Sequence, residues 1–181
     1  MMNQIKLLIL DVDGVLTDGK KYYDKSGTVA LKTFCDKDWT AIKLLKVIGI
    51  EVVLLTGDIF NKFIEDTRGL KTIVNRNNMK HIDKSEYLDE LLKSYDVSED
   101  QTCFVGDDIF DIGLMKKLKY SFCPSDSPEI VKENCFVLNK KGGDNLIFSL
   151  YESLVSKKLI QSYGYEDIIH SLYDEDIKDI F

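Results

Sequence analysis

Short, mostly apolar runs alternate with segments of helical periodicity along this chain. The runs at 5–10 and 51–55 end in polar, Gly-containing turns and predict buried strands. Similar runs predict further strands at 72–74, 102–105, 120–123 and 136–138. Segments with apolar residues every three or four positions predict helices at 39–48, 59–67, 109–118, near 129 and at 145–159, and Ser85 opens another. This alternation predicts an α/β fold, a mostly parallel sheet with helices on both faces.

A β-hairpin is predicted directly after the first strand. Residues 21–24 and 28–34 flank Lys25-Ser26-Gly27, a turn sequence that contains glycine. We expect one domain over residues 1–160, with the hairpin at about 19–34, followed by an acidic tail at 161–181. Two interpretations of the tail stay open: a lid over a site, or an amphipathic helix packed on the domain.

The charge balance limits the classes of partner. The chain has 31 acidic and 24 basic residues among 181, a net charge of -7, which disfavours a nucleic-acid or anionic membrane surface. No apolar run approaches the roughly 18 residues that a membrane span needs. The first residues pass directly into a strand, so we expect no signal peptide. Four cysteines without a Cys-x-x-Cys pair favour reduced thiols and a cytoplasmic protein.

Three predicted strands end in turns that carry reactive side chains. These turns are Asp11-Val12-Asp13-Gly14-Val15, Thr56-Gly57 and Gly106-Asp107-Asp108, and Lys84 lies between the last two. The carboxyl ends of parallel strands meet at one edge of a sheet, where ligands bind. Carboxylates gathered there repel one another unless a cation lies among them, and oxygen ligands in this number suit Mg²⁺ beside a phosphate.

The residue types predict a division of labour in phosphoryl transfer. Asp11, at a strand end, is placed as a nucleophile that forms an acyl phosphate. Asp13 is placed to protonate the leaving oxygen and then to deprotonate water. Thr56, the Gly57 amide and Lys84 are expected to hold the phosphoryl oxygens, and a further residue, Gly14, lets backbone amides approach them.

In order and strand context, these motifs resemble the haloacid dehalogenase superfamily of phosphohydrolases, over about residues 5–150. The stretch from Asp11 to Gly19 resembles the small 3-deoxy-D-manno-octulosonate 8-phosphate phosphatase group, which also includes phosphatases of nine-carbon 2-keto sugar acids such as neuraminate 9-phosphate. The hairpin with Phe34 and Asp38, and Gly142-Gly143, match this group too. The resemblance implies a Rossmann-like core without a separate cap domain. It also implies a homotetramer joined through the hairpins, in which a neighbouring chain helps to cover each site.

The resemblance also implies a metal site. Mg²⁺ is expected between Asp11, the Asp13 carbonyl and Asp107, with Asp108 and Asp111 orienting the ion or its waters. The expected activity is Mg²⁺-dependent hydrolysis of a small phosphorylated metabolite, a sugar or 2-keto sugar acid phosphate. Two alternatives are a phospho-receiver signalling domain, whose motif order differs, and a catalytically inactive oligomeric binding protein.

Three positions depart from the octulosonate phosphatase pattern. Asp58 stands where Thr-Gly-Arg is usual, Trp39 where Asp-Gly is usual, and Asp144 where Gly-Gly-Arg-Gly is usual. Two expected arginines, the natural partners of a sugar carboxylate, are therefore acids. The replacement cation is expected among four residues, Arg68, Arg76, Lys20 and Lys62.

Overall fold

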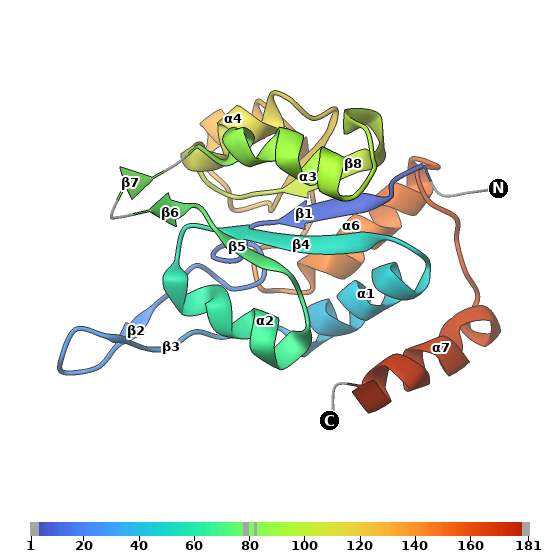
Figure 1. Cartoon of the computed structure of the whole chain (residues 1–181), viewed down its shortest axis with the longest axis horizontal. Coiled ribbons are helices and arrows are strands. Elements are labelled where there is room, and N and C mark those ends of the chain that lie inside the picture. The colour runs from blue at the N-terminus through green and yellow to red at the C-terminus, as the bar shows by residue number, and fades with distance from the viewer. Residues whose placement is uncertain (1–3, 78–79, 82, 179–181) are drawn as a thin grey trace.

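A six-stranded parallel sheet forms the centre of the chain, in the order β10-β9-β8-β1-β4-β5 (Figure 1). The computed structural model describes residues 4–77, 80–81 and 83–178. The first three residues, on which the expectation of no signal peptide partly rests, lie outside the described residues. The strands are β1 (Leu7–Leu10), β4 (Glu51–Thr56), β5 (Thr72–Val74), β8 (Thr102–Val105), β9 (Tyr120–Cys123) and β10 (Phe136–Val137). The predicted strands are confirmed.

Helices cover both faces of the sheet, as predicted. On one face lie α1 (Asp36–Val47), α2 (Phe63–Arg68) and α6 (Leu146–Ser156), and on the other α3 (Leu88–Ser94), α4 (Ile112–Met115) and α5 (Glu129–Lys132). All four residues of β1 are buried, with Leu8 and Leu10 in one apolar cluster and Leu7 and Ile9 in the other. A strand buried on both faces reads as a continuous apolar run, which explains its sequence.

Several helices differ from the predicted ranges, and short 3₁₀ helices account for most differences. The segment 109–118 forms η4 (Ile109–Asp111) and then α4, because the Asp108 carboxylate accepts the Ile109 amide and caps the turn. Other 3₁₀ helices are η1 (Ile59–Lys62), η2 (Lys84–Tyr87) and η3 (Glu99–Gln101). A second small hairpin, β6 (Arg76–Asn77) with β7 (Lys80–His81), was not predicted.

The predicted hairpin is present as β2 (Tyr22–Tyr23) and β3 (Val29–Leu31), in antiparallel pairing. It extends beyond the carboxyl edge of the sheet, at the left of Figure 1. The described residues contain no separate cap domain, which confirms that expectation. Tyr22, Tyr23 and Leu31 are each about half exposed or more, so the hairpin presents apolar side chains to solvent.

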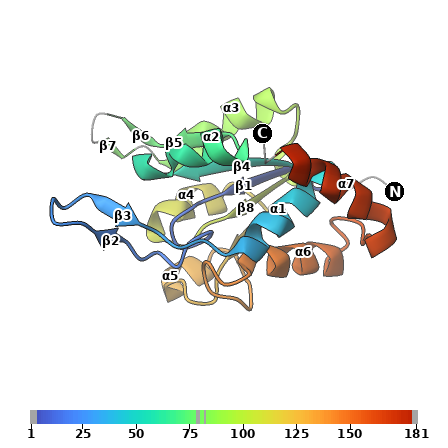
Figure 2. The same cartoon turned by 90° about the horizontal axis from the view of Figure 1, so that it is seen from below.

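The acidic tail forms α7 (Tyr165–Lys178), which packs on α1 at the end of the molecule away from the hairpin (Figures 1 and 2). Lys46 Nζ lies 2.9 Å from Glu175 Oε1 across this contact. The structure therefore supports the packed helix, not the lid over its own site. Across residues 4–77, 80–81 and 83–178, no helix combines the length and apolar character that a membrane crossing requires.

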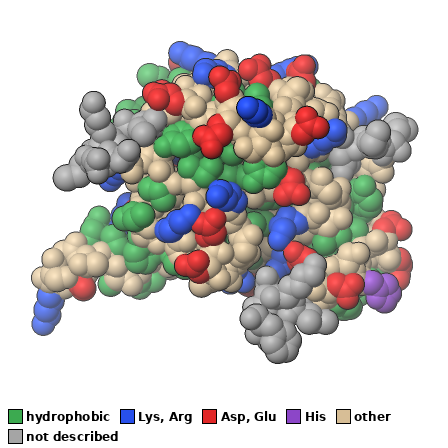
Figure 3. All heavy atoms as spheres, in the orientation of Figure 1, with side chains coloured by type: hydrophobic (Ala, Val, Ile, Leu, Met, Phe, Trp, Pro, Cys, Tyr) green, Lys and Arg blue, Asp and Glu red, His purple; other side chains and the backbone are tan. Residues whose placement is uncertain are grey.

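Acidic and basic side chains are interspersed on the face shown in Figure 3, and no basic patch dominates that face. All four cysteines are free thiols, and Cys103 and Cys123 are buried. The free thiols agree with the expectation of reduced cysteines.

Candidate active site

The polar ends of β1, β4 and β8 meet because these strands are direct neighbours. Leu10 of β1 pairs with Leu54 of β4 and with Val105 of β8, so the turns that follow come together. They surround a cavity of about 340 Å³, large enough for a small metabolite. Its lining consists of Asp11, Asp13, Gly19, Lys21, Thr56, Gly57, Asp58, Arg76, Lys84, Asp107, Asp108, Phe110 and Asp111.

Asp11 lies directly after β1 and is almost fully buried. Its Oδ1 accepts a hydrogen bond from the Val12 amide at 2.7 Å, and its Oδ2 lies 2.8 Å from Lys84 Nζ. Burial raises the pKa of Asp11 to about 7, while the Lys84 ammonium opposes that shift. The carboxylate is thus held on two sides at the wall of the cavity, an orientation that suits a nucleophile.

Lys84 is a buried cation at the start of η2. The Asp83 carboxylate caps this turn by accepting the Ser85 amide at 2.8 Å, which places the Lys84 side chain toward β1. Its ammonium contacts Asp11 at 2.8 Å and Asp111 at 2.6 Å. Although burial disfavours its charge, these carboxylates raise the pKa of Lys84 above its usual value. The ammonium is therefore a permanent positive charge in the site.

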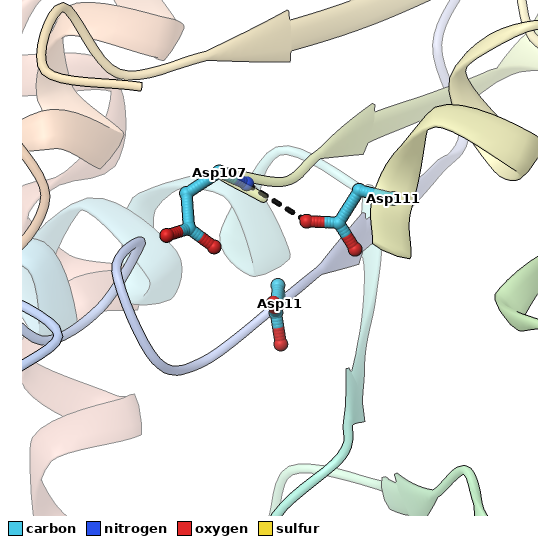
Figure 4. Close-up of side chains that lie close together, drawn as sticks. All are labelled: Asp11, Asp107 and Asp111. Carbon is cyan, nitrogen blue, oxygen red and sulfur yellow. Dashed lines mark hydrogen bonds between the residues drawn. The ribbon is translucent and has the colours of Figure 1, made fainter. Parts of the chain in front are cut away.

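Asp111 organises the turn after β8. One of its oxygens accepts the Asp107 amide at 2.8 Å (Figure 4) and the Asp108 amide at 3.1 Å. The other oxygen accepts the Lys84 ammonium at 2.6 Å. Gly106 permits this arrangement, since a Cβ at Gly106 would overlap the Asp111 carboxylate. Both oxygens of Asp111 are engaged by the protein, which fits the supporting role expected from the sequence.

Asp107 is the carboxylate best placed for a cation. Oxygens of Asp11, Asp107 and Asp111 lie within 4.8 Å of one another (Figure 4). Burial, followed by the charges of Asp11, Asp111 and Asp108, raises the pKa of Asp107 to about 8, and no hydrogen-bond donor among the described residues offsets this. A half-buried carboxylate to which no described residue donates, beside the buried carboxylate of Asp11, is a set of hard oxygen ligands that fits Mg²⁺.

Gly14 brings the first motif against the third. Its φ is +81°, and a Cβ there would overlap the Asp107 carboxylate. The Gly14 amide donates to Thr17 Oγ1 at 3.3 Å, and Gly14 does not line the cavity. Gly14 is therefore the residue that permits close approach of the first turn to Asp107, and its expected place among the phosphate-binding groups stays a prediction.

Thr56 and Gly57 line the cavity from the end of β4, as predicted. The Thr56 hydroxyl oxygen accepts the Asn61 side-chain amide at 2.8 Å, which leaves the hydroxyl hydrogen to donate to a ligand. Gly57 offers a backbone amide beside it. This pair can hold an anion without adding charge.

Charged residues that the motif analysis did not single out also surround Asp13. Lys32 contacts the Asp13 carboxylate at 2.6 Å from within the protein, and Lys21 lies 3.7 Å from it at the cavity wall. Both lysines come from the hairpin. In sequence they resemble solvated hairpin lysines, and no spacing signal separates them from Lys20 or Lys25.

Asp58 is held by cations instead of acting as an isolated acid. Its carboxylate lies 2.7 Å from Lys21 and 2.9 Å from Lys32 and accepts the Phe60 amide at 3.0 Å. Although burial acts in the opposite direction, these contacts hold the pKa of Asp58 well below its usual range. The other two departures, Trp39 and Asp144, lie outside the cavity lining.

Of the four expected replacement cations, only Arg76 lines the cavity. Arg68 stacks on Trp39, 5.0 Å from the ring centroid, Lys62 pairs with Glu65, and Lys20 pairs with Asp18 at 3.1 Å. These three residues do not line the cavity, whereas Lys21, which the sequence did not single out, does.

Gly142 and Gly143 support the first motif from behind. A Cβ at Gly142 would overlap the Gly14 carbonyl, and the Gly143 amide donates to the Val15 carbonyl at 2.9 Å. The glycine pair that the sequence singled out thus shapes the catalytic turn by close backbone contact.

Comparison with known proteins identifies similar hydrolases. The sequence model of the haloacid dehalogenase-like hydrolase family matches residues 55–145. The chain is 35% identical over 146 residues to the 3-deoxy-D-manno-octulosonate 8-phosphate phosphatase of Haemophilus influenzae, covering 78% of each protein.

Solved structures share the fold. A cobalt-bound structure of the Haemophilus influenzae phosphatase superposes with a TM-score of 0.74 at 32% identity, covering 84% of this chain and 88% of the other. The corresponding phosphatase of Yersinia pestis gives a TM-score of 0.74 at 27% identity, with coverage of 88% and 86%.

Proposed function

The chain belongs to the haloacid dehalogenase-like hydrolases and is a phosphoric monoester hydrolase, and on that basis we propose that it hydrolyses a 2-keto sugar acid phosphate with the help of Mg²⁺. The observation that carries the proposal is the contact of Lys84 with Asp11 beside the carboxylate of Asp107, to which no residue in the described ranges donates. This arrangement provides a nucleophile, a fixed cation and a metal position around one cavity.

In the proposed first step, an Asp11 oxygen attacks phosphorus while the bond from phosphorus to the sugar oxygen breaks. Asp13 gives its proton to that leaving oxygen, which produces the free sugar and an aspartyl phosphate on Asp11. In the second step, water attacks phosphorus as Asp13 removes its proton, and the bond to Asp11 breaks to release phosphate. Thr56, Gly57 and Lys84 hold the phosphoryl oxygens throughout.

Asp11, the Asp13 carbonyl and Asp107 would hold Mg²⁺, with Asp108 and Asp111 in supporting positions. When bound, the ion supplies positive charge that offsets the repulsion between the carboxylates and the incoming phosphate. The support for Mg²⁺ is the all-oxygen donor set and the absence of a protein donor to Asp107 in the described part of the chain.

Arg76 is the group proposed to select the sugar acid. The similar phosphatase of Haemophilus influenzae is named for 3-deoxy-D-manno-octulosonate 8-phosphate, a substrate that carries a carboxylate as well as a phosphate. The two lysines Lys21 and Lys32 carry two positive charges. These charges are balanced by the carboxylates of Asp58 and Asp13, which both lysines contact. This leaves the Arg76 guanidinium, at the cavity wall, to pair with the substrate carboxylate.

The hairpin is proposed to join four subunits. Its exposed Tyr22, Tyr23 and Leu31 form an apolar surface next to the cavity, and the chain carries no cap of its own within the described residues. A neighbouring copy seated on the hairpin would shield the cavity from water.

A phosphate-release assay on the purified chain tests the proposed function. We expect Mg²⁺-dependent turnover of 3-deoxy-D-manno-octulosonate 8-phosphate that exceeds turnover of neutral sugar phosphates, and loss of turnover in Asp11→Asn. Arg76→Ala should raise KM at least about tenfold for the sugar acid phosphate but not for a neutral one, since a charge-assisted pair contributes about 1.5–3 kcal/mol. Arg68→Ala, outside the cavity, is the matched control. Equal effects of Arg76→Ala on both substrates would refute the assignment of Arg76.

A further inference from the structure

A lysine ammonium is buried directly behind the cavity wall. The Lys32 side chain has no exposed surface, yet Lys32 directly follows β3 of the hairpin and its neighbour Leu31, the last residue of β3, is 48% exposed. A strand turns successive side chains to opposite sides, which explains how one residue faces solvent and the next faces the site. Burying a charge is costly unless it is paired, so its partners indicate its purpose.

The partners of Lys32 come from two loops of the site. Its Nζ lies 2.6 and 2.9 Å from the two carboxylate oxygens of Asp13, 2.9 Å from Asp58 and 2.8 Å from Asn61 Oδ1. Asn61 in turn donates to Asp13 Oδ2 at 3.2 Å and to Thr56 Oγ1 at 2.8 Å. Both oxygens of Asp13 are therefore held by Lys32 and Asn61, which do not line the cavity.

Lys32 cannot contact a substrate, because its side chain is fully enclosed and does not line the cavity. Lys21 differs in this respect, since its side chain is 30% exposed and reaches the cavity wall. The Asp13 side chain is 24% exposed, so it remains accessible to a ligand while Lys32 holds it. A role in binding is thereby excluded for Lys32, and a role in placing Asp13 is left.

We propose that Lys32 is a positioning residue that fixes the Asp13 carboxylate against the Thr56–Asn61 loop for proton transfer to and from the reacting oxygens. The inference rests on the acid–base role proposed for Asp13. General acid–base groups must lie within hydrogen-bond reach of the reacting atom, and a displacement of about 1 Å can cost on the order of a hundredfold in rate.

Leaving-group dependence tests this role. An alkyl sugar phosphate needs a proton on its leaving oxygen, whereas p-nitrophenyl phosphate releases a stable anion and does not. Since hydrolysis of the aspartyl phosphate is common to both substrates, kcat/KM, which reports the steps through departure of the leaving group, is the quantity to compare. We expect Lys32→Met to lower kcat/KM for the alkyl substrate at least about tenfold more than kcat/KM for the aryl substrate, with Mg²⁺ present. Lys25→Met, at the exposed hairpin tip, should leave both rates unchanged.

Two further variants make each outcome decisive. Asp13→Asn should show the same selective loss. If Asp13→Asn lowers the rates for both substrates equally, the acid role of Asp13 is refuted. If Asp13→Asn shows the selective loss but Lys32→Met lowers both rates equally, only the role of Lys32 is refuted. Lys32→Gln, which keeps a donor without the charge, serves if Lys32→Met does not fold. Failure of both Lys32 variants to fold would also overturn the proposal, because Lys32 would then serve the stability of the hairpin.

Discussion

The carboxylate of Asp38 joins the starts of two helices and makes a pH-dependent contribution to stability. It lies in the first turn of α1, is 1% exposed, and accepts the Ile147 amide of α6 at 2.8 Å through Oδ1. Its Oδ2 is buried, and no hydrogen bond to it is formed within the described part of the chain. Burial therefore raises the pKa of Asp38 from 3.8 to about 6, although the amides of Ile147 and Leu146 oppose the shift.

The sign follows from proton linkage. A carboxyl group with a raised pKa in the folded state binds its proton more tightly there than in the unfolded chain, so its stabilising contribution is complete below about pH 3.8 and is lost as the pH rises through about 6. Between pH 5 and pH 8 the free energy of unfolding falls by about 1.4 kcal/mol. The reason is that pH 5 lies about one unit below the folded-state pKa of about 6, and one unit corresponds to 1.36 kcal/mol. For a chain of this size, that energy shifts Tm by about 3–6 °C.

The perturbation is Asp38→Asn, which keeps an oxygen for the Ile147 amide and removes the charge. We expect its Tm, relative to the wild type, to rise by about 3–6 °C between pH 5 and pH 8, measured by thermal unfolding in matched buffers. Asp36→Asn, an exposed acid in the same helical turn, is the control for a general effect of charge. A Tm difference that stays constant over this range, or changes in the opposite direction, would refute the reasoning.

Three further outcomes can be checked. Gly142→Ala should lower kcat/KM for the sugar phosphate at least about tenfold, because the new Cβ would displace the Gly14 carbonyl. Gly164→Ala is the control and should leave kcat/KM unchanged, because a Cβ at Gly164 would meet only the flexible side chain of Asp167. Asp107→Asn should raise the Mg²⁺ concentration for half-maximal activity at least about tenfold, and an unchanged Mg²⁺ titration would contradict its role as a ligand. Leu31→Lys should reduce the mass measured by light scattering toward 20.8 kDa, and an unchanged mass would contradict assembly through the hairpin.

Sequence reasoning was strongest where chemistry and strand order act together. The apolar run before Asp11 marks β1 as a strand buried on both faces, and strand neighbours then bring Asp11, Thr56 and Asp107 to one edge. The family match agrees with a hydrolase and not with a receiver domain or an inactive binding protein. Such inferences depend on the local periodicity of apolar residues and on the rule that the carboxyl ends of parallel strands meet at one edge of the sheet. Both can be applied to the sequence alone.

The missed features depend on contacts between distant segments. Lys32 reads as a solvated hairpin lysine, because its burial is set by Asp13 and by the loop at Asp58, 19 and 26 residues away. The sequence gives no sign that Gly14 contacts Asp107, because these two residues come close only after the sheet has formed. In the sequence, Asp58 stands at a position where an arginine is expected. In the structure, its charge is balanced by Lys21 and Lys32.

The contact between Gly142 and the Asp11–Gly14 turn also has a consequence for the order of folding. The turn after β1 reaches its final shape only against backbone that is synthesised almost 130 residues later. Such a distant closure carries a loop-entropy cost and slows folding compared with local contacts. We expect pulse-labelling hydrogen exchange to show protection of the Gly143 amide later than that of the β1 and β4 amides, so that the chain acquires its sheet before it acquires its reactivity.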